Sequence, residues 1–253
     1  MPSATALRLQ IEHALERRFP AALTPTPRTI RDCAATGIPA VDKLLDGGFP
    51  VGAISEITGP ASSGRTSLAL SFLAQRSQEE RVCAWVDADD TFDPESAAAG
   101  GMDLQKLLWI RCRTTSGPAN TNSLAHLEQA LRATDLLLQA GGFGALVLDL
   151  AAAPPENGYR IPLTTWFRFR QAADRTRCSL LVLARSPLAQ SSAAVVLECA
   201  PACSATRSQT VLTGYSYQLR SGRQRFAPTI SGERKPPAST WAASASWERE
   251  KRA

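Results

Sequence analysis

The sequence predicts an α/β fold with a mainly parallel sheet, covered by helices on both faces and ending in antiparallel strands. Three observations predict it. Apolar runs of strand length alternate with amphipathic helical segments. Several of these runs are apolar throughout, as in parallel strands that are buried on both faces. The last runs follow one another without a helix between them. With 253 residues, 44% of them hydrophobic, the chain suffices for one globular domain with extensions.

The first segment, residues 4–18, has the spacing of an amphipathic helix. Prolines then break the pattern, which predicts an extended arm to about residue 32. Such a helix must cover its apolar stripe with the main domain or with another subunit. We favour another subunit, because the arm leads away from the domain. The candidate partner-binding residues of this first element, 1–32, are Leu7, Ile11, Leu15 and Phe19.

The predicted core covers residues 33–228. Its first half contains a turn and short helix (36–49), then a strand (52–59), a tight loop that opens a helix (60–78) and a second strand (81–89). Residues 93–100 begin a helix with Asp93 as cap and Pro94 in the first turn. A third strand is expected at 107–112.

The second half continues the alternation. It predicts helices at 121–139 and 163–177, and strands at 145–151, 179–185 and 193–199. Residues 210–220 and 223–228 alternate like a hairpin. From about 229 to 253 the composition predicts a flexible tail, in which Trp241 and Trp247 are candidate docking anchors.

Composition excludes several classes of protein. No run of about 20 apolar residues is long enough to span a membrane, and the first residues lack the pattern of a secretory signal, so we expect a cytoplasmic protein without membrane partners. The six cysteines form no CxxC pair, which indicates reduced core thiols rather than a metal site. The net charge of +5 fits a nucleic acid partner or an acidic protein surface, but also a simple bias towards arginine.

The strongest local motif is Gly59-Pro60-Ala61-Ser62-Ser63-Gly64-Arg65-Thr66, placed between a strand and a helix. Backbone N–H groups in such a loop, with the following helix N-terminus, can bind phosphate oxygens. The hydroxyl of Thr66 would face magnesium. Position 65 is arginine instead of the usual lysine, and a planar guanidinium does not replace a compact ammonium at a shaped site. The loop therefore either binds phosphate without fast hydrolysis, or keeps its shape and binds nothing. The candidate nucleotide-binding residues are Gly59, Pro60, Ser62, Ser63, Gly64, Arg65, Thr66, Ser67 and Asp93.

Asp149 ends an apolar strand, where an unpaired carboxylate is costly, so we assign it a functional role. Asp87, Asp89 and Asp90 follow another strand, and a solvated strand end explains them nearly as well as catalysis does.

Here the chain resembles the RecA family of recombinases. The resemblance rests on GIPAVDKLLDGGFPVGAISEITGPASSGRTSLAL, VDADDTFDPESAAAGGMDLQKLLW and GALVLDL, in the same order and spacing. It implies that Arg65 replaces the phosphate-loop lysine and that Asp89 replaces the glutamate that activates water. Asp93 and Pro94 would lie beside adenine, and Asp149 would help to hold magnesium through water. An aspartate is one methylene shorter than a glutamate, so Asp89 would be a displaced base.

The two DNA-binding loops of that family are reduced here. The first would fall in residues 154–162 and is shortened. For the second, only residues 186–192 are present, without the family's glutamine. Homologous strand exchange is therefore not expected. A RecA core with these departures resembles the ImuA-type accessory proteins of the mutasome, and also the related division-inhibitor-like group.

A basic segment interleaved with aromatic residues supplies candidate contacts to single-stranded DNA. A solvated helix face is the commoner explanation of such a pattern. The DNA-binding candidates are Arg160, Trp166, Arg168, Arg170 and Arg175.

Three functions compete. The favoured one is an adaptor in damage-induced mutagenesis and translesion synthesis, which binds RecA or an error-prone Y-family-like polymerase and is at most a weak ATPase. The second is a DNA-stimulated ATPase of recombination repair, and the third is a cell-division-inhibitor-like interaction protein. The cofactor prediction is open between ATP with Mg²⁺ and none.

Overall fold

The computed structural model describes residues 32–112, 123–154, 158, 160–201, 204–208, 211–224 and 238–244. The chain separates into two compact units, residues 1–31 and 32–253. The first unit lies outside the described residues, and so do its candidate partner-binding residues and Trp247. The account below concerns the second unit alone.

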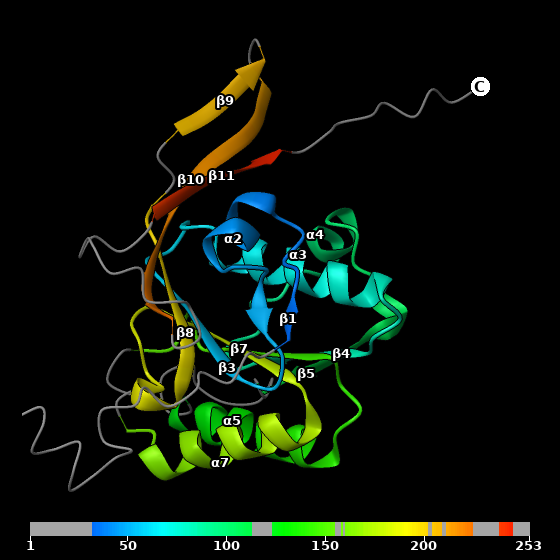
Figure 1. Ribbon diagram of the computed structural model, residues 1–253, viewed down its shortest axis with the longest axis vertical. Helices are drawn as coiled ribbons and strands as arrows, with labels where there is room; N and C mark the ends of the chain where they lie inside the picture. The colour runs from blue at the N-terminus through cyan, green and yellow to red at the C-terminus, as the bar shows by residue number, and fades with distance from the viewer. Residues whose placement is uncertain are drawn as a thin grey trace, which may run out of the picture. The chain divides into compact units, whose positions relative to one another are not determined.

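The centre of this unit is a sheet in the strand order β11-β10-β8-β3-β7-β6-β4-β5, with β9 paired to β10 (Figure 1). The parallel strands are β3 (Ile54–Thr58), β4 (Cys83–Asp87), β5 (Leu107–Arg111), β6 (Ala145–Asp149), β7 (Ser179–Ala184) and β8 (Ala193–Cys199). β3, β4, β6 and β7 are buried at every position, which explains why β4, β6 and β7 are mostly apolar without alternation, whereas β3 also buries Ser55, Glu56 and Thr58.

Helices cover both faces of the sheet (Figure 1). α2 (Pro39–Leu44), α3 (Arg65–Gln78) and α4 (Pro94–Ala99) lie on one side, and α5 (Ser123–Ala140) and α7 (Leu163–Thr176) on the other. Each side has its own apolar core: Phe49, Phe72 and Trp85 belong to the first, and Leu138, Trp166 and Phe169 to the second. Short 3₁₀ turns, η1 (Leu104–Lys106) and η2 (Gln190–Ser192), and a two-stranded sheet of β1 (Cys33–Ala34) and β2 (Phe49–Pro50) complete the unit. The mainly parallel α/β fold is thus confirmed.

The antiparallel end of the sheet is also confirmed, but its details differ from the prediction. β10 (Val211–Gln224) is one long strand that pairs with β8, β9 (Ser204–Ser208) and β11 (Ala238–Ser244). The predicted hairpin between 210–220 and 223–228 is therefore wrong, because β10 continues through its expected turn. The flexible tail predicted for 229–253 is likewise wrong for Ala238–Ser244, which form the strand β11.

Two predictions from composition can be compared with the described residues. Of the described cysteines, which form no disulfide, Cys33 is exposed and the others are buried: Cys83, Cys112, Cys178 and Cys199. Among the described helices, none has the length and apolar character needed to cross a bilayer.

Candidate phosphate-binding site

The sheet brings the predicted site residues to one edge. In parallel strands the carboxyl ends lie together, and here Thr58 pairs with Ala184, Leu183 with Asp149, and Asp149 with Asp87. The loop after β3, the acidic ends of β4 and β6, and the end of β7 therefore meet. This edge is where open α/β sheets bind their ligands.

The loop after β3 has the backbone of a phosphate-binding loop. Gly59 (φ 149°), Ser62 (φ 58°) and Gly64 (φ 83°) all have positive φ, and α3 begins directly after them. A Cβ atom at Gly59 would lie 2.3 Å from the carbonyl oxygen of Cys199, so glycine is required there. Pro60 and Ser62 are exposed, Ser67 is half-buried and Ser63 is buried. The loop thus presents part of its backbone to solvent at the N-terminus of a long helix.

Arg65 does not extend into solvent from this loop. Its side chain is buried, and Nη1 donates a hydrogen bond of 2.6 Å to the carbonyl oxygen of Ala184 at the end of β7. Burial lowers the pKa of Arg65, while the charge of Asp149 opposes that change. The guanidinium is therefore an internal cation of the sheet edge.

Asp149 is the buried carboxylate beside it. Its Oδ1 accepts a hydrogen bond of 3.0 Å from the backbone N–H of Ala151. Burial raises the pKa of Asp149 to about 6; the N–H of Ala151 and the charge of Arg65 oppose this, and the charges of Asp87 and Asp89 add to it. Arg65 thus offsets only part of the effect of burial and of the two neighbouring aspartates, at a residue where the family resemblance implies water-mediated magnesium.

Asp87 and Asp89 have different roles at the end of β4. The buried carboxylate of Asp87 accepts hydrogen bonds from the backbone N–H groups of Thr91 (3.0 Å) and Phe92 (2.9 Å). It therefore fixes the loop that follows β4. Asp89 is half-buried, and its charge contributes to the raised pKa of Asp149. Its role as a displaced base stays a prediction.

The residues fit a phosphate group better than they fit magnesium–ATP. The backbone of the loop has the required shape, and Thr66 is exposed in the first turn of α3. The other predicted metal residue, Asp149, already has the charge of Arg65 nearby, and Arg65 is bound to Ala184. Among the described residues, no three His, Cys, Asp or Glu side chains gather as a metal site. We therefore assign no reaction step to magnesium–ATP here.

Asp93 caps α4, as the sequence predicts. Its carboxylate accepts hydrogen bonds from the backbone N–H groups of Glu95 (3.2 Å) and Ser96 (3.3 Å), and from the hydroxyl of Ser96. These bonds lower the pKa of the exposed Asp93 carboxyl, the hydroxyl of Ser96 having the largest effect. That Asp93 lies beside adenine remains a prediction, because these capping hydrogen bonds neither require nor prevent such a contact.

Two aromatic side chains pack against the loop. Tyr217 of β10 and Trp241 of β11 are stacked with ring centroids 4.8 Å apart, and both are buried in the first core. A Cβ atom at Gly64 would lie 2.9 Å from the Tyr217 ring and 3.1 Å from the Trp241 ring. Trp241 is thus not an exposed docking anchor in this structure, which corrects that prediction. Strand pairing places it in the core instead.

The DNA-binding candidates divide into two groups. Trp166 is fully buried in the second core, at 5.9 Å from Phe169, so it cannot stack on a base, and this candidate is corrected. Arg168 is exposed but pairs with Asp135 of α5 at 3.0 Å. The remaining candidates lie on the surface as predicted: Arg160, Arg170 and Arg175.

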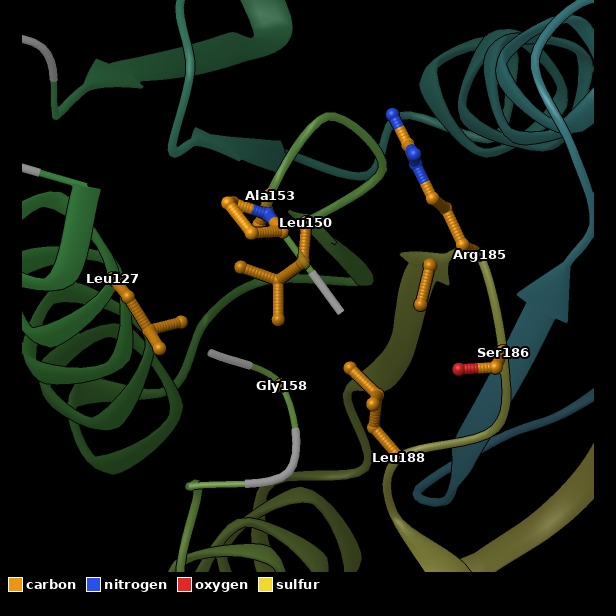
Figure 2. Close-up of a pocket in the computed structure, with 9 residues that line it drawn as sticks. Leu127, Leu150, Ala153, Gly158, Arg185, Ser186 and Leu188 are labelled. Carbon is orange, nitrogen blue, oxygen red and sulfur yellow. The ribbon is translucent and has the colours of Figure 1, made fainter. Parts of the chain in front are cut away.

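The remnants of the two expected DNA loops pack on each other. A small pocket at the ends of β6 and β7 has Leu127, Leu150 and Leu188 pointing into it, while the Arg185 side chain extends away from this apolar lining (Figure 2). A Cβ atom at Gly158 would lie 2.6 Å from Leu188. Gly158 of the first remnant therefore lies against Leu188 of the second.

Sequence reasoning missed Glu56, a buried carboxylate in the middle of β3. Its Oε1 accepts hydrogen bonds from the backbone N–H groups of Leu188 (2.6 Å) and Ala189 (2.8 Å). Burial raises the pKa of Glu56, and these two hydrogen bonds oppose the change. The signal was present, because a single carboxylate in a strand predicted to lie inside a sheet covered on both faces needs a partner.

Comparison with known proteins follows this geometry. The family model "RecA N-terminal domain" matches residues 6–158. Over 123 residues the chain is 41% identical to Protein RecA of Allorhizobium ampelinum, covering 48% of this chain and 31% of that protein. It is 40% identical to Protein RecA of Agrobacterium fabrum, with the same coverage of both chains. The match thus spans about a third of the length of these curated relatives.

A solved structure shows the same fold at low sequence identity. The crystal structure of the RadB recombinase matches with a TM-score of 0.59 and 18% identity, covering 82% of this chain and 94% of that one. The order of strands, the phosphate loop and the family model agree, and the chain belongs to the RecA N-terminal domain family.

Proposed function

We propose that this chain is an accessory protein of damage-induced mutagenesis: a RecA-like adaptor that binds RecA or an error-prone Y-family-like polymerase in translesion synthesis. It would act in the cytoplasm and would not exchange strands. The observation that carries the proposal is the position of Arg65. Its guanidinium is buried and bound to Ala184, so the residue that should contact phosphate instead takes part in holding the sheet edge together.

The reduced DNA loops support the same proposal. A strand-exchange protein needs exposed, polar segments that contact DNA along its length. Here Leu188 and Ala189 are buried, and Glu56 holds their backbone N–H groups. Residues in such positions support a scaffold for protein partners better than a DNA-pairing surface.

The names of the relatives favour one alternative. The solved structure with the same fold is that of a recombinase, RadB, so a DNA-stimulated ATPase of recombination repair is the second candidate. It would require Arg65 to leave Ala184 and bind phosphate, with Asp89 as base. The two candidates therefore differ in ATP turnover and in partner binding.

The first test of the adaptor is partner capture with the full chain. Immobilised protein should retain RecA or the Y-family polymerase from the same organism, and Leu7→Asp with Ile11→Asp should reduce retention at least tenfold. The matched control is Arg8→Asp with Glu12→Lys, which changes charges off the apolar stripe and should retain both partners.

The second test is ATP turnover with magnesium, with and without single-stranded DNA. We expect turnover at the level of the Asp149→Ala variant. DNA-stimulated turnover that Asp149→Ala abolishes, together with no capture of either partner, would establish the ATPase alternative instead.

A further inference from the structure

Strand β11 covers part of the phosphate loop through one side chain. Trp241 is 6% exposed and Tyr217 is 8% exposed, and both rings pack where a side chain at Gly64 would be. Gly64 is the residue before the first turn of α3, at the N-terminus that a phosphate would approach. The chain therefore places apolar surface of its own against this end of the loop.

The position of Trp241 depends on strand pairing. β11 pairs antiparallel with β10 from Gly214↔Ser244 to Arg220↔Ala238, and Tyr217 lies directly opposite Trp241. Ser239 of the same strand donates a hydrogen bond of 3.2 Å to the carbonyl oxygen of Ala40 in α2. If β11 separated from β10, the indole of Trp241 would therefore leave Gly64 together with the rest of the strand.

Charge and solvation make this contact unfavourable for an anion. A phosphate beside two packed aromatic rings loses water that must be replaced by N–H groups and a cation. The cation of the loop, Arg65, is engaged with Ala184 and has Asp149 nearby. An incoming phosphate would meet the rings of Tyr217 and Trp241 on one side. On the other side it would meet the guanidinium of Arg65, which is already hydrogen-bonded to Ala184.

We propose that β11 is a strap over the phosphate loop: while Trp241 lies on Gly64 the loop takes up no nucleotide phosphate, and release of β11 opens it. The inference rests on the proposed function, in which the nucleotide site is degenerate, and names how that site is regulated.

Hydrogen exchange of the full chain tests the strap without any ligand. Trp241→Ala should speed exchange of the backbone N–H groups of residues 63–65, the buried and half-buried part of the loop, at least tenfold, with far smaller changes in β4 and β6. Trp241→Phe keeps a ring at Gly64 and should stay within threefold of wild type. Tyr215→Ala is the matched control, because Tyr215 is an aromatic residue of the neighbouring strand β10 and is 41% exposed. Unchanged exchange in the loop of a folded Trp241→Ala variant contradicts the proposal.

Equilibrium binding of ATP without added magnesium is the second measurement, because the loop backbone fits a phosphate group. We expect at least tenfold tighter binding to Trp241→Ala, or to the more conservative Trp241→Leu, than to wild type or Tyr215→Ala. Equal affinity in all four proteins overturns the strap, and so does an open loop that still binds no ATP. Tighter binding by the variant together with failed partner capture would keep the strap and reject the adaptor. Normal partner capture, together with unchanged hydrogen exchange in Trp241→Ala, would keep the adaptor and reject the strap.

Discussion

At Asp149, burial and the charges of Asp87 and Asp89 raise the pKa of the carboxyl group, whereas the N–H of Ala151 and the charge of Arg65 lower it. Burial dominates and raises the pKa to about 6 in the folded chain, from an ordinary value of 3.8, although Arg65 favours the ionised form. Between these two values the folded state binds more protons than the unfolded state. The stabilising contribution of Asp149 is therefore complete below about pH 4 and is lost as the pH rises through about 6.

Replacing Asp149 by asparagine should remove this pH dependence. We expect the free energy of unfolding of wild type to fall relative to Asp149→Asn as the pH rises from about 4 to about 6, by up to about 3 kcal/mol. Urea unfolding of both proteins across this range measures the difference. Glu56 titrates in both proteins, so its contribution cancels. The exposed Asp46→Asn serves as control, and a difference for Asp149→Asn that does not vary with pH would contradict the assignment.

Gly59 of the phosphate loop and Gly142 after α5 both have positive φ, 149° and 87°, but differ in the space around them. Gly59→Ala would place its Cβ atom 2.3 Å from the carbonyl oxygen of Cys199, whereas a Cβ atom at Gly142, also with positive φ, would meet nothing within 4 Å. We expect Gly142→Ala to cost about 1 kcal/mol and Gly59→Ala at least about 2 kcal/mol more. Equal losses in urea unfolding would show that backbone conformation alone sets the cost.

The sequence predicts the position of single site residues better than their partners. The loop residues and Asp149 are at the predicted edge, because strand ends are visible as apolar runs. The hydrogen bond from Arg65 to Ala184 joins residues that are far apart in sequence, so no local pattern indicates it. The same is true of the bonds from Leu188 and Ala189 to Glu56.

Among the elements, α7 has a buried apolar side and an exposed basic side. Trp166, Phe169 and Ala173 recur at spacings of three and four and are buried, which a closer reading of the helical period could have predicted. Arg170 and Arg175 lie on the solvent side. If this helix contacts DNA, it does so through these arginines and not through Trp166.

Replacing Arg170 and Arg175 by alanine should weaken binding of single-stranded DNA. It should also reduce the slope of log K against log salt concentration by about 1.4, which is about 0.7 for each of the two lost phosphate contacts. Fluorescence anisotropy across a range of salt concentrations measures both quantities. Arg111→Ala removes an exposed arginine that pairs with Asp90 and should leave binding unchanged. Equal effects of the two variants would indicate only a dependence on net charge.

β11 was missed because its composition is that of a flexible tail. Ala, Ser and Thr in residues 238–244 do not specify a strand alone, and the pairing with β10 depends on tertiary context. Trp241 supplies the packing that favours the paired state, through Tyr217 and the space at Gly64. Composition alone does not reveal such a contact.

For the whole molecule, the fold class was predictable because buried parallel strands and the helices between them have distinct periods. Where the chain departs from that rule, prediction became weaker: β10 continues through an expected turn, and the connection from β7 to β8 contains no long helix. Long-range pairing decides both features.

Residues 32–253 form one compact unit, so this fragment should fold without residues 1–31. We expect cooperative urea unfolding and a near-ultraviolet circular dichroism spectrum close to that of the full chain, since Trp85, Trp109 and Trp166 lie within the unit. Partner capture, in contrast, should be lost with Leu7, Ile11, Leu15 and Phe19. A fragment that is unfolded, or one that still captures both partners, would contradict this division of roles.

Glu56 fastens the backbone between β7 and β8 to the middle of the sheet. Only glutamine offers a similar oxygen at a similar reach, so a saturation screen of position 56 should reject nearly every other residue. Such a profile is usually interpreted as the mark of an acid that takes part in a reaction. In this chain it would instead report the stability lost when the short connection between β7 and β8 is no longer held to β3.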